Sequence, residues 1–310
     1  MLALDRILIA RDFSSVSERA LRYAFDLAAR TGADLHVLHA EVLHEGGEDP
    51  DRPSPTDGLD AIRRELADQE RSPDADALDA VSVHGVVERD VAAGPAILNY
   101  ADEHGIDLIT MGTHGRRGAR RVLIGSVAEE VVRQSDRPVL TVRGKQDASF
   151  AATGAVNRIL VPVDFSDHSR EALLYARELA ALYDAQVDLL HVIEERLPPA
   201  YYVGGVKSIY DTNPDIEDEA VDALTSFAEE TAGPEGTVVP HAVPGSASSA
   251  VVEFVEEHDI DLVATSTHGR TGLDRFLLGS VAEKIVRHVH CPVLTVKAFG
   301  KSLVSNGTEA

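Results

Sequence analysis

The 310-residue sequence is poor in cysteine, long apolar runs and basic side chains, and each shortage excludes a class of protein. Its one cysteine, Cys291, excludes an internal disulfide framework and is typical of the reducing cytoplasm, which we take as the expected location. No apolar run approaches the ~20 residues of a membrane helix. Asp and Glu outnumber Lys and Arg by 52 to 29, so the chain as a whole should repel nucleic acid and anionic membranes.

What the sequence does contain is a glycine-rich segment, residues 111–126, between an apolar run at 106–110 and a segment of helical spacing that starts at Val127. Glycine lets backbone N–H groups approach a ligand without a Cβ in the way. The N–H groups at a helix start are unpaired and lie at the positive end of the helix dipole. Gly125 and Ser126 therefore predict a phosphate site, with an ordinary strand–loop–helix turn as the alternative.

A second copy of this segment favours the binding interpretation. Another apolar run, 260–265, leads into a second glycine segment, and the same interval separates Gly115 from Gly269 and Gly125 from Gly279. Nine residues lie between the two glycines in both copies. A turn without a ligand need not keep that spacing twice.

The repeat extends over the whole chain. Arg6–Ser14 recurs as Arg158–Ser166, and predicted strands alternate with predicted helices in each half. We therefore predict an α/β protein of two tandem doubly wound domains, each a parallel sheet with helices on both faces. The predicted boundaries are residues 1–144 and 157–298 for the domains, 145–156 for a linker and 299–310 for a tail.

The strand ends predict where a ligand would lie. In open parallel sheets, ligands bind beyond the carboxyl ends of the strands, where the strand order reverses. Asp12 follows the first strand and Gly115 follows the fourth, so we expect both to face one crevice. Asp164 and Gly269 should face a second crevice in the same way.

Together these residues resemble the universal stress protein family, as a tandem of two such domains over about residues 4–143 and 157–297. The signature of that family is Gly-x2-Gly-x9-Gly-Ser/Thr. The first half satisfies it with Gly112, Gly115, Gly125 and Ser126. The second half has Ser266 in place of the first glycine and then matches at Gly269, Gly279 and Ser280.

The resemblance implies a five-stranded sheet of order 3-2-1-4-5 that binds ATP or another adenine nucleotide, often with a divalent ion such as Mg²⁺. The strand-one aspartate and the strand-two backbone would hold adenine, and the glycine loop would hold ribose and phosphates. Carried over by position, the nucleotide-binding residues are Ala10, Asp12, Ala40, Met111, Gly112, His114, Gly115, Arg116, Gly125, Ser126 and Val127 in the first half, and Pro162, Val163, Asp164, Val192, Ser266, His268, Gly269, Arg270, Gly279, Ser280 and Val281 in the second.

On the adenine side, the second half has Pro162, Val163, Asp164 and Val192, whereas the first half keeps Asp12 but has Ala10, Arg11 and Ala40. Arg11 stands where the second half has Val163, and a bulky cation at that position has the size to fill or reshape an adenine pocket. The second half therefore has the fuller adenine side.

Several charged and histidine side chains leave the chemistry open. The loop arginines (Arg116, Arg117, Arg120 and Arg121) would attract a triphosphate or form salt bridges. His114 and His268 would orient the loop backbone or act as catalytic bases, whereas His39 and His191 should be partly buried and hydrogen-bonded. His288, His290 and Cys291 fit no standard zinc spacing, and we predict no metal site there.

Three functions remain. We favour a stress-response protein that binds adenine nucleotides, with no hydrolysis or only slow hydrolysis of ATP. The alternatives are an ATPase or phosphotransferase that uses the loop histidines, and a scaffold without nucleotide. We also predict an intrachain pseudo-dimer in which the two last strands, 138–142 and 292–296, meet near a pseudo-twofold axis. A further homodimer is left open.

Overall fold

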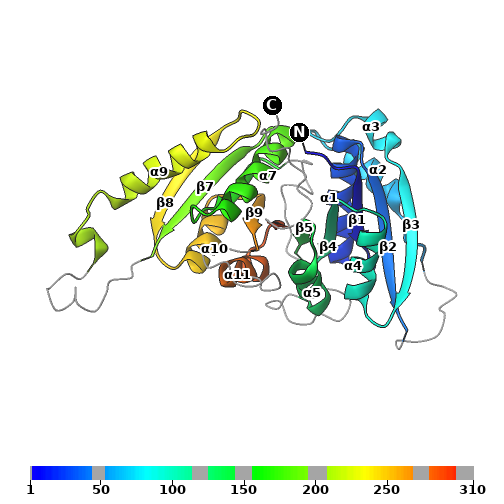
Figure 1. Cartoon of the computed structure of the whole chain (residues 1–310). Coiled ribbons are helices and arrows are strands. Elements are labelled where there is room, and N and C mark those ends of the chain that lie inside the picture. Colours follow the sequence, from blue (N-terminus) through cyan, green and yellow to red (C-terminus); the bar gives the residue numbers. More distant parts are fainter. Residues whose placement is uncertain are drawn as a thin grey trace, which may run out of the picture.

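The computed structural model describes residues 2–43, 53–113, 125–143, 156–194, 208–267 and 279–297. Strands and helices alternate through two successive halves (Figure 1). The first half contains β1 Arg6–Ala10, α1 Ser15–Thr31, β2 Asp34–Val42, α2 Leu59–Ala67, α3 Ala75–Ala80, β3 Val83–Asp90, α4 Ala93–Glu103, β4 Leu108–Gly112, α5 Ser126–Gln134 and β5 Val139–Val142. The second half contains β6 Arg158–Pro162, α7 Asp167–Tyr183, β7 Gln186–Ile193, the 3-10 helix η1 Ile209–Asp211, α9 Ile216–Glu230, β8 Val238–Pro244, α10 Ala247–Glu257, β9 Leu262–Ser266, α11 Ser280–His288 and β10 Val293–Val296.

The described strands form one sheet of order β3-β2-β1-β4-β5-β10-β9-β6-β7-β8. Each half is parallel and has the order 3-2-1-4-5, so the predicted fold class is confirmed. The halves join where β5 and β10 pair antiparallel, with Leu140 opposite Leu294. This pairing confirms that the two last strands meet at a pseudo-twofold axis.

Local sequence signals explain where the long helices begin and end. The Ser14 hydroxyl accepts a hydrogen bond from the Ser17 amide at 3.2 Å and caps α1, and Ser166 caps α7 through Ser169 in the same way. Gly32 ends α1 with a positive φ of 74°, a conformation that costs glycine little. The short helix α3 was not expected from the sequence.

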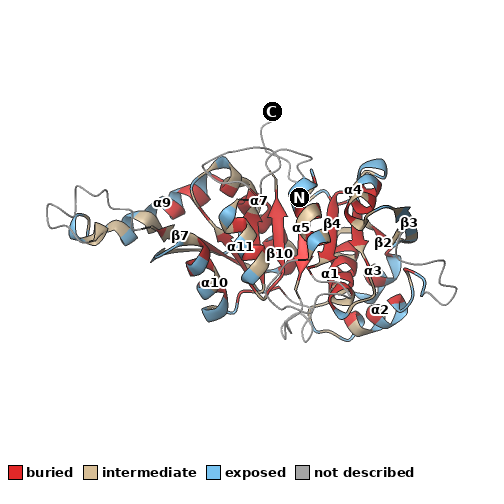
Figure 2. Ribbon diagram, turned by 90° about the horizontal axis from the view of Figure 1, so that it is seen from below, coloured by how far each residue is buried: buried red, intermediate tan, exposed pale blue. Residues whose placement is uncertain are grey.

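Apolar side chains fill both faces of the sheet. One core lies beneath α1 and α7 and the other beneath α4, α5, α10 and α11. Figure 2 shows that the strands around the β5–β10 junction are buried, while the edge strands of the sheet are more exposed. Because α1 and α7 share one face, their core runs through both halves without a break.

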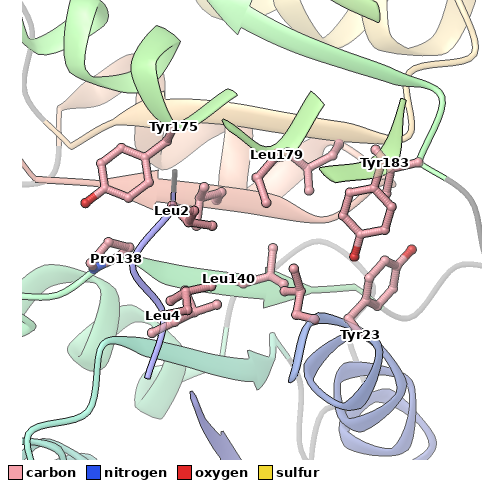
Figure 3. A pocket seen from close by; sticks show the side chains of 13 residues that line it. Leu2, Leu4, Tyr23, Pro138, Leu140, Tyr175, Leu179 and Tyr183 are labelled. Atoms are coloured by element: carbon pink, nitrogen blue, oxygen red, sulfur yellow. The ribbon is translucent and has the colours of Figure 1, made fainter. Parts of the chain in front are cut away.

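The junction beneath α1 and α7 contains an apolar pocket (Figure 3), and a buried polar cluster lies beside it. Leu4, Leu140 and Leu179 line the pocket. At one end, the Tyr183 hydroxyl donates a 2.6 Å hydrogen bond to the carboxylate of Asp26, which is fully buried. Asp26 also pairs with Arg30, whose guanidinium lies 4.5 Å from the Tyr183 ring centroid.

Candidate functional site

The strand order reverses between β1 and β4 in the first half. β1 leads into α1 on one face of the sheet, and the helix that follows β4, α5, packs on the opposite face. The two strands are direct neighbours, and Ala10 pairs with Met111. Asp12 and Gly112 therefore lie at the same carboxyl edge, which is where an open α/β sheet leaves room for a ligand.

The turn after the first strand of each half holds its aspartate in a fixed position. A carboxylate oxygen of Asp12 accepts the Ser14 amide at 3.0 Å, and Asp164 accepts the Ser166 amide at 3.1 Å. The residues between them, Phe13 and Phe165, have a φ of 62° each, which is uncommon for a residue other than glycine. The two halves thus build the same turn, and each aspartate is only partly buried.

A histidine at the end of the second strand braces each turn. Nδ1 of His39 lies 2.8 Å from the Arg11 carbonyl oxygen, and Nδ1 of His191 lies 2.8 Å from the Val163 carbonyl oxygen. A carbonyl oxygen only accepts, so each Nδ1 carries the proton. The rings pack against Phe13 and Phe165 with centroid distances of 5.0 and 4.7 Å. The prediction that both histidines are partly buried and hydrogen-bonded is confirmed.

The helix starts that follow the glycine loops are fixed by backbone contacts. The Gly125 amide donates to the Thr113 carbonyl oxygen at 2.6 Å, and the Gly279 amide donates to the Thr267 carbonyl oxygen at 2.7 Å. Neither glycine supplies a side-chain cap to α5 or α11. The first turns of α5 and α11, whose N–H groups have no partner within the helix, therefore begin at the carboxyl edge of the sheet, a favourable place for an anion. Sequence reasoning missed both threonines, although they occupy matching positions in the two repeats.

The wall of each crevice is apolar and only partly covered. Ala10, Ala40 and Val127 pack against the core beneath α4 and α5, and Val192 and Val281 do the same in the second half. Val192 replaces Ala40, so the second crevice has the larger wall. Ser126 and Ser280 are exposed, while Gly125, Pro162 and Gly279 are partly buried.

Two residues predicted to bind nucleotide turn their side chains into the core. Met111 is 4% exposed beneath α4 and α5, and Val163 is 4% exposed on the opposite face, beneath α7. The backbone of Val163 is engaged as well, because its amide donates to Leu190 and its carbonyl oxygen accepts from His191.

Arg11 does not fill the first crevice. Its guanidinium is 6% exposed and forms two hydrogen bonds to the Glu18 carboxylate, at 2.8 and 2.9 Å. It also donates to the carbonyl oxygens of Pro55 and Asp57. Arg11 alternates with Ala10 along the strand, so its side chain points toward α1 rather than toward the crevice. The interpretation of Arg11 as an obstacle to adenine is therefore wrong.

The pairing between the first and fourth strands is shorter in the second half. β1 and β4 pair as far as Ala10 and Met111, whereas β6 and β9 pair only at Ile159–Leu262 and Leu160–Val263. Pro162 explains the difference. The Val163 amide donates to Leu190 of β7, and successive residues of a central strand point their N–H groups to opposite neighbours, so residue 162 faces β9. Proline has no N–H to donate, and the ladder therefore stops there.

Gly112 and Ser266 occupy matching positions at the carboxyl ends of β4 and β9, near the point where the pairing of β6 with β9 stops. A Cβ on Gly112 would lie 3.0 Å from Val16 Cγ1 and 3.2 Å from the Ser17 amide nitrogen. Gly112 thus permits close packing of β4 against α1, a structural reason for glycine that requires no ligand. The second half carries a side chain there, at the end where β6 and β9 no longer pair.

Part of the predicted site lies outside the described residues, namely His114, Gly115, Arg116, His268, Gly269 and Arg270. Within the described ranges, no group of three or more His, Cys, Asp or Glu is arranged to hold a metal ion. No helix among them is long and apolar enough to cross a membrane.

A model of the universal stress protein family matches residues 3–143 and again residues 155–297. The chain belongs to the universal stress protein family. Its members include universal stress protein MJ0531 of Methanocaldococcus jannaschii, 36% identical over 144 residues that cover 45% of this chain and 81% of that protein. Universal stress protein A homolog 1 of Coxiella burnetii is 39% identical over 141 residues, or 44% of this chain and 94% of that one.

A structure from Pseudomonas aeruginosa PAO1, the functionally unknown protein PA1789, matches the tandem architecture. It superposes with a TM-score of 0.67 over 96% of this chain and 93% of its own, at 18% sequence identity. At that identity the likeness supports the fold alone. Family membership accounts for the duplicated pattern, since each half of this chain corresponds to one family domain.

Proposed function

We propose that each half binds one adenine nucleotide, ATP or a related compound, and that the chain acts in stress response by binding rather than by catalysis. The observation that carries the proposal is the pairing, on neighbouring strands, of a fixed aspartate with a helix start whose N-cap residue is glycine. This pairing occurs twice with the same hydrogen bonds.

Each part of the crevice suits one part of an adenine nucleotide. The carboxylates of Asp12 and Asp164 suit the exocyclic amino group of adenine, which is a hydrogen-bond donor. The apolar wall at Ala40, or at Val192 in the second half, suits the face of the base. The exposed Ser126 and Ser280 and the N–H groups of the same helical turn suit the phosphates. Mg²⁺ would accompany a triphosphate through the phosphate oxygens.

The geometry favours binding over hydrolysis. Asp12 and Asp164 accept backbone amides within their own turns, which fixes them as acceptors. His39 and His191 use Nδ1 to hold the turns. The enzymatic alternative uses His114 or His268, and phosphate release by the His114→Ala variant tests it. We expect the variant and the wild type to release phosphate at the same background rate, and turnover that depends on the histidine would refute the binding function.

The occupancy test begins with mass spectrometry of nucleotide released when the purified protein is denatured. Equilibrium binding of ATP should then give two sites per chain. Asp12→Ala and Asp164→Ala should each remove one site, and the exposed Asp60→Ala should remove none. An untreated chain that carries no nucleotide and binds none at millimolar ATP would support the scaffold alternative. Cytoplasmic location remains part of the proposal and rests on the lone Cys291.

A further inference from the structure

A cluster of histidines lies away from both crevices, between β2, β3 and α4 on the outer side of the first half (Figure 1). His36 on β2 is 8% exposed, and its Nδ1 lies 2.7 Å from the Tyr100 hydroxyl. Its ring centroid is 4.8 Å from that of His84 and 6.3 Å from that of His104. His104 in turn stacks on Tyr100.

The other nitrogen of His36, Nε2, is buried and has no hydrogen-bond partner among the residues that the structure describes. In one tautomer it is a buried lone pair without a donor, and in the other it is a buried N–H without an acceptor. Protonation of the ring would force Nε2 to carry a buried N–H in either case. A buried charge without a partner is costly, so the folded cluster selects the neutral ring.

The second half has a carboxylate at the same position. His36 pairs with Leu8, and Asp188 pairs with Leu160, the equivalent residue of β6. Asp188 is fully buried and accepts hydrogen bonds from Arg158 at 2.8 and 3.0 Å, from His241 at 2.8 Å and from Gln186 at 3.0 Å. The two halves therefore place different groups at equivalent positions, an imidazole in the first half and a carboxylate in the second.

The surroundings of the two positions are otherwise closely matched. Arg6 donates to the His104 carbonyl oxygen as Arg158 donates to that of His258. His104 stacks on Tyr100 as His258 stacks on Phe254. Where Arg158 has the Asp188 carboxylate, Arg6 has His36, and the Arg6 charge acts against protonation of that ring.

The groups that face His36 favour its neutral form. Burial lowers the pKa of His36, and the charges of His84, His104 and Arg6 lower it further, whereas Asp34 acts in the opposite direction. The titratable and charged groups around the ring come from β1, β2, β3 and α4; they are Arg6, Asp34, His84, Glu88, Tyr100 and His104.

The second half responds differently to acid. Burial alone raises the pKa of Asp188, but the hydrogen bonds from His241 and Arg158 outweigh it and bring the pKa to about 2. Asp188 therefore stays charged in mild acid, and its contribution is lost only as the pH falls from 3.8 toward 2. For His36 the unfolded chain takes up the proton first, so stability falls as the pH drops below 6.5.

We propose that the histidine cluster makes the first half an acid sensor, which opens β2, β3 and α4 in mild acid while the second half stays closed. The carboxyl end of β2 carries His39 and Ala40, which brace and line the first crevice. Acid therefore releases nucleotide from the first crevice before the second. This last consequence rests on the proposed function, whereas the opening itself does not.

Amide hydrogen exchange of the full chain without nucleotide tests the opening, at about pH 7.5 and about pH 5, values on either side of the ordinary histidine pKa. After correction for intrinsic exchange rates, protection in β2, β3 and α4 should fall by about tenfold for each unit between the unfolded pKa of 6.5 and either the folded pKa or the lower measurement pH, whichever is higher. Protection in β7, β8 and α10 should not change. An equal fall in both halves, or no fall in the first, would overturn the proposal.

Substitutions at the two equivalent positions distinguish opening caused by protonation of His36 from a nonspecific loss of protection at low pH. His36→Gln and His36→Asp should both abolish the acid-dependent opening, the first by removing the titration and the second by giving Arg6 a carboxylate. Asp188→His should transfer the opening to the second half. His288→Gln, which changes an exposed histidine of α11, is the control and should leave the opening intact. Persistence of the opening in a folded His36→Gln variant would contradict the sensor.

The same exchange experiment repeated with ATP separates the two proposals. Protection by ATP of both crevices at about pH 7.5, and of the second alone at about pH 5, is the expected result. If ATP protects neither crevice, the proposed function fails and the acid opening is judged by the exchange without nucleotide.

Discussion

Thr141 and Thr295 make the same hydrogen bond in opposite directions across the junction of the two halves. The Thr141 hydroxyl donates to the Val293 carbonyl oxygen at 3.2 Å, and the Thr295 hydroxyl donates to the Val139 carbonyl oxygen at 3.1 Å. Both threonines are 1% exposed. The two bonds lie on either side of Leu140 and Leu294, so they mark the pseudo-twofold axis and tie one half to the other.

Removing these hydroxyls should weaken the junction. Thr141→Val and Thr295→Val keep the shape of the side chain and delete one hydrogen bond each, which should lower the free energy of unfolding by about 1 kcal/mol per substitution. Thr110→Val is the matched control, because the Thr110 hydroxyl is buried on β4 and meets no hydrogen-bond partner within the described part of the chain. Denaturant unfolding should show little change in the free energy of unfolding for Thr110→Val. Equal losses of stability in all three variants would argue against a stabilising role for the two hydrogen bonds across the junction.

Tyr183→Phe should cost more than a surface substitution of the same kind. It removes the hydroxyl that donates to the buried carboxylate of Asp26 across the junction, a loss of about 1.5–3 kcal/mol for a bond to a charged group. Tyr210→Phe also removes a hydroxyl bonded to a carboxylate, that of Glu217, but in an exposed setting. The difference between the two unfolding midpoints checks the prediction, and a Tyr183→Phe variant as stable as Tyr210→Phe would refute it.

Glu18→Gln tests the anchoring of Arg11. The substitution leaves a buried guanidinium without its carboxylate and should destabilise the first half by about 1–3 kcal/mol. Glu65→Gln breaks the more exposed Arg22–Glu65 pair and should cost less than about 1 kcal/mol. Hydrogen exchange in α2 would report the loosening, because Arg11 holds the carbonyl oxygens of Pro55 and Asp57 just before that helix.

Gly112→Ala separates packing from ligand binding at the first signature glycine. The new methyl group would meet Val16 and Ser17 at 3.0–3.3 Å, and we expect a loss of about 1–3 kcal/mol in stability without nucleotide. The reciprocal change, Ser266→Gly, should cost less than about 1 kcal/mol. Thermal unfolding of the nucleotide-free proteins decides the matter, and a stable Gly112→Ala variant that had lost only ATP binding would give the glycine a ligand role instead.

Much of the fold could be predicted from short sequence patterns. Ser14 and Gly32 mark the ends of α1, and the repeat of Arg6–Ser14 as Arg158–Ser166 marks the matching start of α7. Such features depend on neighbours within a few residues, so composition and spacing reveal them. The two Asp turns were also placed correctly at the ends of the first strands, because strand ends can be read from where apolar runs stop.

The side-chain directions could not be predicted in the same way. Arg11 looked like an obstacle beside Asp12, yet its partners are Glu18 on α1 and the carbonyl oxygens of Pro55 and Asp57. Those partners come from a different helix and a later segment of the chain. The anchoring of Gly125 to Thr113 is equally hidden, since it depends on where the loop closes.

The duplicated sequence by itself determined that this chain would form two α/β halves with strand order 3-2-1-4-5, since each half repeats one family pattern. Only the tertiary structure decided which polar groups meet. It set His36 of the first half and Asp188 of the second at one equivalent place, and it directed Arg11 away from the crevice. Sequence patterns report local spacing, whereas burial and hydrogen-bond partners depend on elements that the fold brings together from distant parts of the chain.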